Sequence, residues 1–419
     1  MSETFEVVET RKLASFRTVD AIEPIEGADA IELAVVGGWK VVTKKGEFKV
    51  GDLAVYFEID SFLPTGVPAW QFLVDKQSRT QGDVVGHRLR TIKLRGQISQ
   101  GLILPVAAFG DTLAELAKRD DVFDLNLNEV LNITKWDPPL PAQLAGLAAG
   151  LFPSFIQKTD QERAQNLKPE IFQYDDVVSP IDLTVEQAAE GIAAGRLTVI
   201  DGVVHTIRAG KAKRGARYEV TMKMDGSSAT FFHYNGEIGV CSRNLQLKTT
   251  DENKENSFVR MLFDSGLNWA MEKYGNIAIQ GELMGPAIQG NRENLKDFRL
   301  YVFDIQLLDE GRKATAAERY AILSDMISRG VNPNKVFIAP ILVAVEGAKL
   351  KFVDHLTELN QARTFSLEEL GLDTMEKLLA FAEGPSLVHA VREGLVYKRE
   401  GDQFSFKTIS NAYLAKEKD

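Results

Sequence analysis

Residues 219–232 read EVTMKMDGSSATFF and contain the short pattern Lys-x-Asp-Gly. On each side of this pattern lies a run rich in β-branched and aromatic residues, which predicts two strands. Asp225 and Gly226 favour a tight turn between the strands. A lysine at the end of a buried strand is costly unless a negative group meets it, and it can act as a nucleophile once its pKa is lowered. The stretch therefore predicts a turn that presents Lys223 into a cavity. A solvated hairpin with an ordinary surface lysine is the alternative.

Five further motifs follow downstream. They are Ser242-Arg243-Asn244, Gly281-Glu282-Leu283-Met284-Gly285-Pro286, Leu300-Tyr301-Val302-Phe303-Asp304-Ile305, Glu393-Gly394-Leu395-Val396-Tyr397-Lys398 and Phe406-Lys407-Thr408-Ile409-Ser410. Together with the Lys223 pattern, and in this order, they resemble nucleotidyltransferase motifs I, Ia, III, IIIa, IV and V of the covalent polynucleotide ligase and RNA-capping superfamily. Six short motifs in one order are a more specific signal than a single tetrapeptide.

The composition is ordinary for a globular protein. Hydrophobic residues make up 44% of the 419 residues and charged residues 26%, and this length allows two or three cores. No run is long enough to span a bilayer, and the N-terminus lacks a signal-peptide pattern. The single cysteine, Cys241, excludes an internal disulfide and favours a reducing compartment. No zinc-ligand spacing is present. We therefore expect a cytoplasmic protein without a membrane segment.

The formal net charge of −10 argues against a protein that coats nucleic acid non-specifically. Contact with nucleic acid would have to use local basic patches. Two such patches lie at residues 87–95 and 211–217. The alternative for each is a solvated strand face or loop.

Residues 1–110 read as many short strands separated by glycine-rich turns, which predicts a small closed β-barrel. The run 94–105 resembles the OB module of the phenylalanyl-tRNA synthetase β-chain type, although an SH3-like barrel fits the pattern almost as well. Residues 111–150 are predicted to be a connector. In it, helical composition at 113–117 and 142–149 flanks a proline-rich break.

The run 151–166 resembles the entry segment of RNA ligases that carry an N-terminal OB module. In such a segment, basic and amide residues would suit the phosphates of ATP or an RNA 5′-phosphate. The residues concerned are Lys158, Arg163, Gln165 and Asn166. The alternative is the start of a helix with a polar face, capped by Thr159 or Asp160.

The overall prediction is an α+β protein. An OB-like barrel is followed by an ATP-grasp-like ligase nucleotidyltransferase (adenylyltransferase) domain, residues 151–419, of antiparallel sheets flanked by helices. Strands are expected over most of 218–305 and near 335–345, 394–399 and 403–408, and helices at 185–194, 256–274, 312–330 and 365–392. Segment 175–217 lies outside the resemblance.

The resemblance implies adenylyl transfer in three steps. The Nζ atom of Lys223 attacks the α-phosphorus of ATP and releases pyrophosphate, which leaves lysyl-AMP. The AMP moves to a 5′-phosphate, and a 3′-hydroxyl then displaces AMP. A neutral lysine is needed, so Mg²⁺ or Mn²⁺ close to Nζ is expected.

The resemblance also brings three acids, Asp225, Glu282 and Glu393, together on that cation, which they would hold through water. Glu282 could instead bind the ATP ribose or form a strand-end salt bridge. Phe303 would stack on adenine, although an aromatic residue in an alternating strand is more often a core residue.

The remaining nucleotide contacts are expected from polar residues. Arg243 suits a bidentate phosphate contact and Asn244 a ribose or phosphate hydrogen bond. Lys398 and Lys407 would neutralise charge at the α-phosphate. Motif V usually carries two lysines one residue apart, but Ser405 occupies the earlier position here. Gly226 and Arg163 complete the expected nucleotide-binding set.

The domain order resembles the OB-first group of ATP-dependent RNA ligases, because only twelve residues follow Lys407 and the β-rich module precedes the motifs. We therefore expect a monomeric RNA ligase that seals 5′-phosphate and 3′-hydroxyl ends, as in RNA nick repair. The alternatives are a DNA nick ligase, a GTP-using transferase of the capping type, and a non-catalytic OB-based RNA-binding protein.

Overall fold

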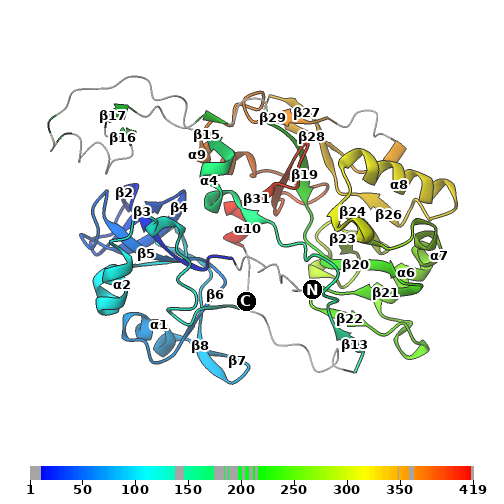
Figure 1. The fold of residues 1–419 in the computed structure, drawn as a ribbon, viewed down its shortest axis with the longest axis horizontal. Coiled ribbons are helices and arrows are strands. Elements are labelled where there is room, and N and C mark those ends of the chain that lie inside the picture. Colours follow the sequence, from blue (N-terminus) through cyan, green and yellow to red (C-terminus); the bar gives the residue numbers. More distant parts are fainter. Residues whose placement is uncertain are drawn as a thin grey trace, which may run out of the picture. The chain divides into compact units, whose positions relative to one another are not determined.

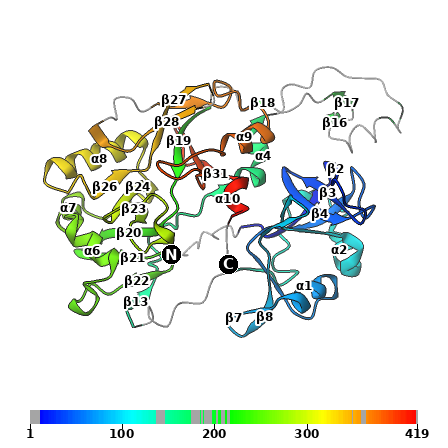
Figure 2. The same cartoon turned by 180° about the vertical axis from the view of Figure 1, so that it is seen from behind.

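The computed structural model describes residues 11–136, 146–173, 216–347, 349–357 and 363–416, with short pieces at 184, 187, 197–200, 203–206 and 211–212. The chain divides into two compact units, Met1–Pro139 with Tyr174–Gly210, and Leu140–Gln173 with Lys211–Asp419. Figures 1 and 2 show the fold from opposite sides. Within these ranges no helix has the length and apolar character needed to cross a membrane.

The first unit is built from short antiparallel strands. They form small sheets with the orders β1-β5-β11, β2-β3-β4, β12-β6-β8-β7, β10-β9 and β16-β17. The strands are β1 (Ala14–Thr18), β2 (Ala21–Pro24), β3 (Ile31–Val36), β4 (Trp39–Lys44), β5 (Leu53–Phe57), β6 (Ser61–Pro64), β7 (Arg79–Gln81), β8 (Val84–Arg88), β9 (Thr91–Leu94), β10 (Gln97–Gln100), β11 (Leu102–Pro105), β12 (Thr134–Lys135), β16 (Leu197–Ile200) and β17 (Val203–Thr206). The helices are η1 (Pro68–Trp70), α1 (Gln71–Lys76), η2 (Val106–Phe109), α2 (Gly110–Leu116) and η3 (Val122–Asp124).

Strand β5 is buried on both faces. Val55 and Phe57 pack into one hydrophobic cluster, while Tyr56, which alternates with them, packs into another around Trp39. The strand period of two produces this division. Leu113 of α2 belongs to the first cluster, so part of the stretch predicted as a connector contributes to the core of this unit. The domain boundaries at 110 and 150 stay predictions.

The second unit contains two large sheets. The eight-stranded sheet has the order β13 (Ala148–Leu151), β22 (Leu245–Leu247), β21 (Glu237–Cys241), β20 (Ser227–Tyr234), β23 (Ile277–Met284), β24 (Arg299–Leu307) and β25 (Arg312–Lys313), and β26 (Val336–Ile338) pairs with β24. The seven-stranded sheet has the order β14 (Glu162–Arg163), β31 (Ser405–Ile409), β30 (Gly394–Arg399), β19 (Arg217–Lys223), β27 (Ile341–Glu346) and β28 (Lys349–Val353), and β29 (Phe365–Ser366) pairs with β19. A separate two-stranded sheet joins β15 (Phe172–Gln173) and β18 (Lys211–Ala212).

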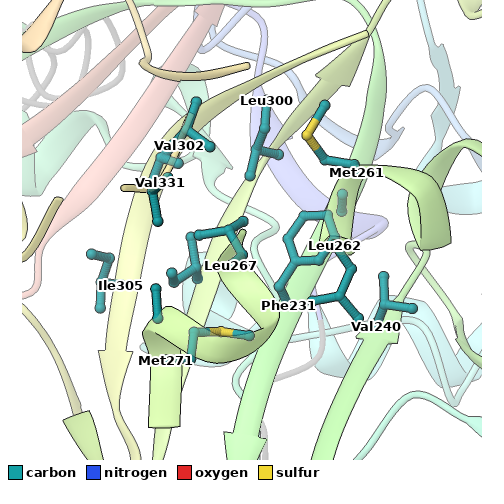
Figure 3. Packing of buried hydrophobic residues seen from close by; sticks show 14 of the residues in the cluster. Phe231, Val240, Met261, Leu262, Leu267, Met271, Leu300, Val302, Ile305 and Val331 are labelled. Carbon is teal, nitrogen blue, oxygen red and sulfur yellow. The ribbon is translucent and has the colours of Figure 1, made fainter. Parts of the chain in front are cut away.

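Helices cover these sheets. They are η4 (Ala164–Asn166), α4 (Lys168–Ile171), η5 (Asp251–Asn253), α6 (Ser257–Asp264), α7 (Leu267–Ala270), η6 (Met271–Tyr274), η7 (Gln289–Asn291), η8 (Leu308–Glu310), α8 (Ala316–Ser328), α9 (Met375–Phe381) and α10 (Asn411–Leu414). Figure 3 shows how the side chains of α6 and α7 pack on the large sheet: Met261 and Leu262 of α6 and Leu267 of α7 gather with Phe231 and Leu300 of the strands. Each fully buried side chain of this size contributes about 1.5–3 kcal/mol relative to exposure.

Strands β19 and β20 are consecutive in the chain, yet they belong to different sheets. Lys223 ends β19, and β20 begins at Ser227. The turn between them therefore lies where the two sheets meet, and the alternative of a solvated hairpin is wrong. The helices predicted at 256–274 and 312–330 are confirmed by α6, α7, η6 and α8.

Two helix predictions and one alternative are wrong. In the stretch 365–392 only α9 forms, because Gly384 and Pro385 follow its end and cannot continue it. The described part of 142–149 ends in β13, which pairs with β22. No helix starts at Thr159 or Asp160. Two residues before Thr159, the backbone of Gln157 is held by the side chains of Gln280 and Gln306. The helix predicted at 185–194 lies almost entirely outside the described residues.

Candidate active site at the junction of two sheets

Lys223 forms an ion pair with Glu393, and strand pairing brings them together. The Nζ atom lies 2.8 Å from Glu393 Oε1. Glu393 comes directly before β30, whose first residue, Gly394, pairs with Lys223 in antiparallel register. A Cβ atom at Gly394 would lie 2.1 Å from the carbonyl oxygen of Thr408. Glycine is therefore required for β30 to begin beside β31 at this point.

The turn after Lys223 approaches β23 closely. The backbone N–H of Gly226 donates to Glu282 Oε1 at 3.0 Å. A Cβ atom at Gly226 would lie 2.5 Å from the carbonyl oxygen of Leu283, so only glycine fits against this strand. The same close approach brings Glu282 of one sheet to Lys223 of the other.

The three predicted acids form one electrostatic group with Lys223. Burial lowers the pKa of Lys223, but the three surrounding carboxylates outweigh it, so the pKa is raised overall. Burial, helped by Glu393 and Asp225, raises the pKa of Glu282 to about 7. Burial and Glu393 also raise the pKa of Asp225. Burial is the main cause of the two carboxyl shifts and the neighbouring acids add to it, so a cation at this place would stabilise the ionised acids.

Asp225 has two further partners that the sequence analysis missed. Arg292 Nε lies 3.3 Å from Asp225 Oδ2, and the guanidinium lies 4.8 Å from the ring centroid of Tyr413. Both groups favour the ionised form of Asp225: the Arg292 charge and a hydrogen bond from Tyr413 each act to lower its pKa against the raising effect of burial. Tyr413 belongs to α10, so the last described helix contacts the turn after Lys223 through its side chain.

The loop that carries Arg292 has an unusual backbone. Four non-glycine residues between Gly285 and Leu295 have positive φ. They are Ala287 (φ 64°), Gln289 (φ 43°), Asn291 (φ 48°) and Asn294 (φ 51°). Such residues are uncommon and concentrate at functional sites. The Ala-x-Gln-Gly-Asn run after Pro286 contains Gly290 and Asn291, residue types that tolerate this geometry, and it could have drawn attention to the loop.

Lys398 of β30 lies in a different environment. Its Nζ donates to Asp304 Oδ1 at 2.6 Å and to the carbonyl oxygen of Phe303, while Lys313 Nζ lies 2.9 Å from Asp304 Oδ2. Burial, with the charges of Arg319 and Lys313, lowers the pKa of Lys398 to about 8, even though Asp304 opposes this. The lysines hold the pKa of Asp304 well below its usual value despite burial.

A β-bulge sets the position of Phe303. Gln280 pairs with Asp304 and the next residue, Gly281, pairs with Val302, so Phe303 is the extra residue of β24. A bulge turns a side chain out of the regular alternation. The half-buried Phe303 ring lies 5.9 Å from Lys398 Nζ and lines a narrow pocket between the two sheets together with Glu219 and Tyr320.

A buried ionic cluster lines the same pocket and was also missed. Arg319 donates to the two carboxylate oxygens of Glu219 at 2.5 and 2.7 Å, and the hydroxyl of Tyr320 donates to the same carboxylate. Glu219, Thr221 and Lys223 share one face of β19 because strand side chains alternate. The strand therefore connects this cluster with Lys223.

The entry segment lies beside motifs Ia and V. Lys158 Nζ lies 3.4 Å from Asn244 Oδ1, and Arg243 pairs with Asp160 at 3.1 Å. Buried Arg163 pairs in parallel register with Lys407, through β14 and β31. The structure thus brings together the predicted phosphate-binding residues of this segment and two motifs that are distant in sequence.

Comparisons with known proteins agree with this arrangement. A family model described as RNA ligase matches residues 216–409, and one described as OB-fold domain matches residues 13–106. A search of curated proteins finds no match.

Solved structures of Naegleria gruberi RNA ligase are similar over almost the whole chain. A mutant with ATP and Mn is 38% identical, covers 98% of this chain and 100% of its own, and has a TM-score of 0.71. The complex with PPi is 38% identical, covers 96% of this chain and 98% of its own, and has a TM-score of 0.70. A mutant with AMP and Mn is 38% identical, with coverages of 98% and 100% and a TM-score of 0.70.

An OB-fold unit followed by two sheets that enclose a lysine and three acids defines a ligase of the nucleotidyltransferase type. The chain belongs to the RNA ligase family. The resemblance drawn from the ordered motifs is confirmed, and the OB-fold is confirmed over the SH3-like alternative.

Proposed function

We propose that this RNA ligase uses ATP and Mg²⁺ or Mn²⁺ to join a 5′-phosphate to a 3′-hydroxyl, through lysyl-AMP at Lys223. The observation that carries the proposal is the position of Lys223 at the sheet junction, 2.8 Å from Glu393 and beside Glu282 and Asp225. The similar Naegleria gruberi structures include ones with ATP and Mn and with AMP and Mn, which supports ATP as the nucleotide.

In the first step Lys223 loses its proton to solvent, because a protonated amine has no lone pair for attack. Nζ then forms a bond to the α-phosphorus of ATP, and the bond from that phosphorus to the bridging oxygen breaks, so pyrophosphate leaves. Glu393, in contact with Nζ, holds the amine in a fixed direction for attack. Covalent capture divides a difficult displacement into two easier ones.

Asp225, Glu282 and Glu393 would hold the cation. In the described part of the chain no three acidic, histidine or cysteine side chains converge tightly enough to ligate an ion directly. We therefore propose contact through water, which suits the hydration of Mg²⁺. When bound, the cation offsets the acids, lowers the pKa of Lys223 and reduces negative charge at the α-phosphate.

The remaining predicted residues would bind the nucleotide. We propose that the Phe303 ring stacks on adenine, since the bulge turns it into the pocket at the sheet junction. Lys398 and Lys407 would neutralise the α-phosphate. The other proposed contacts are Arg163, Arg243, Asn244 and Gly226.

In the second step an oxygen of the RNA 5′-phosphate attacks the phosphorus of lysyl-AMP, and the phosphorus–nitrogen bond breaks. In the third step the 3′-hydroxyl attacks the activated 5′-phosphorus and AMP leaves. We propose a nicked duplex as the substrate, since it holds the two ends in line. We also propose that the enzyme is a monomer.

The test is intact-mass measurement after incubation with ATP or GTP and Mg²⁺. The wild type should gain one AMP with ATP and nothing with GTP, and Lys223→Ala should gain none. Lys377→Ala, which removes an exposed lysine paired with Asp373, serves as the control and should behave like the wild type. An adduct on Lys223→Ala would place the nucleophile elsewhere, and a GMP adduct would favour the capping-type alternative.

A second measurement addresses the RNA end. Nicked duplexes that differ only in the 3′-terminal sugar, each with a pre-adenylylated 5′ end, should seal about tenfold faster with ribose. A buried partner for the 2′-hydroxyl costs about 1–3 kcal/mol when left unsatisfied. Equal rates would make the protein a general nick ligase.

A further inference from the structure

A segment of the OB-fold unit has a charge opposite to that of the whole chain. Between Asp83 and Asp111 there are four arginines or lysines and no acid, although the net charge of the chain is −10. Arg88, at the start of this segment, is neutralised by Asp60 at 2.8 Å. Two of the three cations farther along, Lys93 and Arg95, belong to the hairpin of β9 and β10.

The tip of this hairpin is strained in a way that packing does not explain. Leu94 pairs with Gln97, so Arg95 and Gly96 form a two-residue loop, and their φ values are 45° and 85°. Positive φ at both positions is the pattern of a type I′ turn, in which asparagine or aspartate normally precedes glycine. The exposed Arg95 side chain donates to the carbonyl oxygen of Gly27 at 3.2 Å, a contact that water could replace.

The base of the hairpin is fixed while its tip is exposed. Near the base, buried Ser99 accepts a hydrogen bond from the backbone N–H of Val42 in β4 at 3.0 Å. Toward the tip, Lys93 is exposed, and Ile92 and Leu94 are 42% and 38% exposed. The tip therefore presents cations and apolar side chains together on a supported β-ribbon.

We propose that the tip of this hairpin, Lys93 to Arg95, binds the sugar–phosphate backbone of the RNA substrate. The inference rests on the proposed function, which supplies a polyanionic substrate. Exposed cations on a projecting ribbon suit an extended chain of phosphates, whereas a compact anion such as pyrophosphate is normally held by donors that converge in a concave site. Asparagine would fit the positive φ at position 95 better than arginine, but its short, neutral side chain could not neutralise a phosphate. The phosphate contact therefore gives a reason for an arginine at this position.

The test compares Arg95→Asn and Lys93→Gln in the full-length protein. The probe is an RNA duplex with one nick carrying 3′-hydroxyl and 5′-phosphate ends, titrated without ATP at several salt concentrations. Each variant should bind several-fold more weakly, and the slope of log affinity against log salt should fall by about one. The melting temperature of Arg95→Asn should be equal to or above that of the wild type, because asparagine tolerates positive φ. Lysyl-AMP formation should be unchanged.

Lys118→Gln is the matched control, since Lys118 is an exposed cation of the same unit (69% exposed) paired with Glu115. RNA affinity equal to the wild type in both hairpin variants, or reduced equally in the control, would overturn the proposal. Loss of lysyl-AMP formation in the hairpin variants would assign the tip to the nucleotide step and would also overturn it. A wild-type protein that forms no lysyl-AMP would instead refute the proposed function itself.

Discussion

Lys223 and Lys398 lie on neighbouring strands of one sheet, but their surroundings shift their pKa values in opposite directions. Three carboxylates around Lys223 raise its pKa against the effect of burial. Around Lys398, burial and the charges of Arg319 and Lys313 outweigh the carboxylates of Asp304 and Glu219, so the pKa of Lys398 is lowered to about 8. One region of the site has an excess of acids and the other an excess of cations.

This difference matches the two charges that adenylyl transfer must handle. The acid-rich region would attract a metal cation, and Lys223 would become a nucleophile only when that cation reduces the negative field. The cation-rich region would attract phosphate, and Lys398 would act while still protonated. Because both residues are lysines, residue type does not distinguish the proposed nucleophile, Lys223, from the proposed charge stabiliser, Lys398. The balance of neighbouring acids and cations does.

The largest expected effect is at the acid-rich region. Glu393→Gln should slow lysyl-AMP formation about a hundredfold in single-turnover measurements with excess ATP, because one group that holds Nζ and the cation is lost. If Glu393 only locked the lysine in its protonated form, the variant would be faster, since the pKa of Lys223 would fall. Glu369→Gln, which removes an exposed acid paired with Arg217, is the control and should leave the rate unchanged.

At the cation-rich region the main expected effect is on folding. Asp304→Asn should lower the free energy of unfolding by about 3 kcal/mol, because Lys398 and Lys313 would remain partly buried without a counter-ion. Urea denaturation measures this change. The exposed pair of Asp373 and Lys377 offers the control, and Asp373→Asn should leave the denaturation midpoint unchanged. Equal midpoints for both variants would show that the stability of this region does not depend on Asp304.

Substitution of Phe303 tests whether the adenine base of ATP binds at the cation-rich region. Phe303→Ala should raise the KM for ATP about tenfold or more, since stacking on a base is worth about 1–3 kcal/mol. Phe303→Tyr keeps the ring and should stay near the wild type. An unchanged KM for the alanine variant, with unchanged melting temperature, would contradict stacking and leave Phe303 as a packing residue.

The smallest expected effect is a shift in the pH at which the rate of lysyl-AMP formation falls. Lys398 must be protonated to stabilise phosphate, and its lowered pKa of about 8 means that the charge is lost as pH rises through that value. The rate of lysyl-AMP formation should therefore fall above about pH 8. Lys398→Arg, which stays protonated, should move this fall to higher pH. If the rate falls over the same pH range in both proteins, the fall reports the titration of a group other than Lys398.

The turn residues, the ordered motifs and most strands could be predicted because they depend on local chemistry. Lys223, Asp225, Glu282 and Glu393 do meet at one place, as the motif order implied. Their catalytic roles stay predictions. Arg292 could not be identified beforehand, because an arginine in a polar loop carries no periodic signal, and only the folded loop brings it to Asp225.

The burial of Glu219 and Arg319 could not be predicted from the sequence either. Glu219 lies in strand β19 and Arg319 in helix α8. A charged residue in either element would be expected at the surface. They are buried because α8 packs across the sheet and each supplies the counter-ion of the other. Likewise, the bulge that turns Phe303 depends on the register of β23 against β24, which alternation in one strand does not specify.

By itself, the sequence determined which reactive residues the chain contains and in which order they occur. They are a lysine before an Asp-Gly turn, glycines where strands approach closely, and acids at strand ends. These follow from short-range sterics and from the properties of single side chains. Only the tertiary structure decided which charges became neighbours, because it placed β19 and β20 in different sheets and let the turn between them join the two. Opposite pKa shifts of two lysines in one sheet are a property of packing, since Coulomb interaction and desolvation depend on distance and burial.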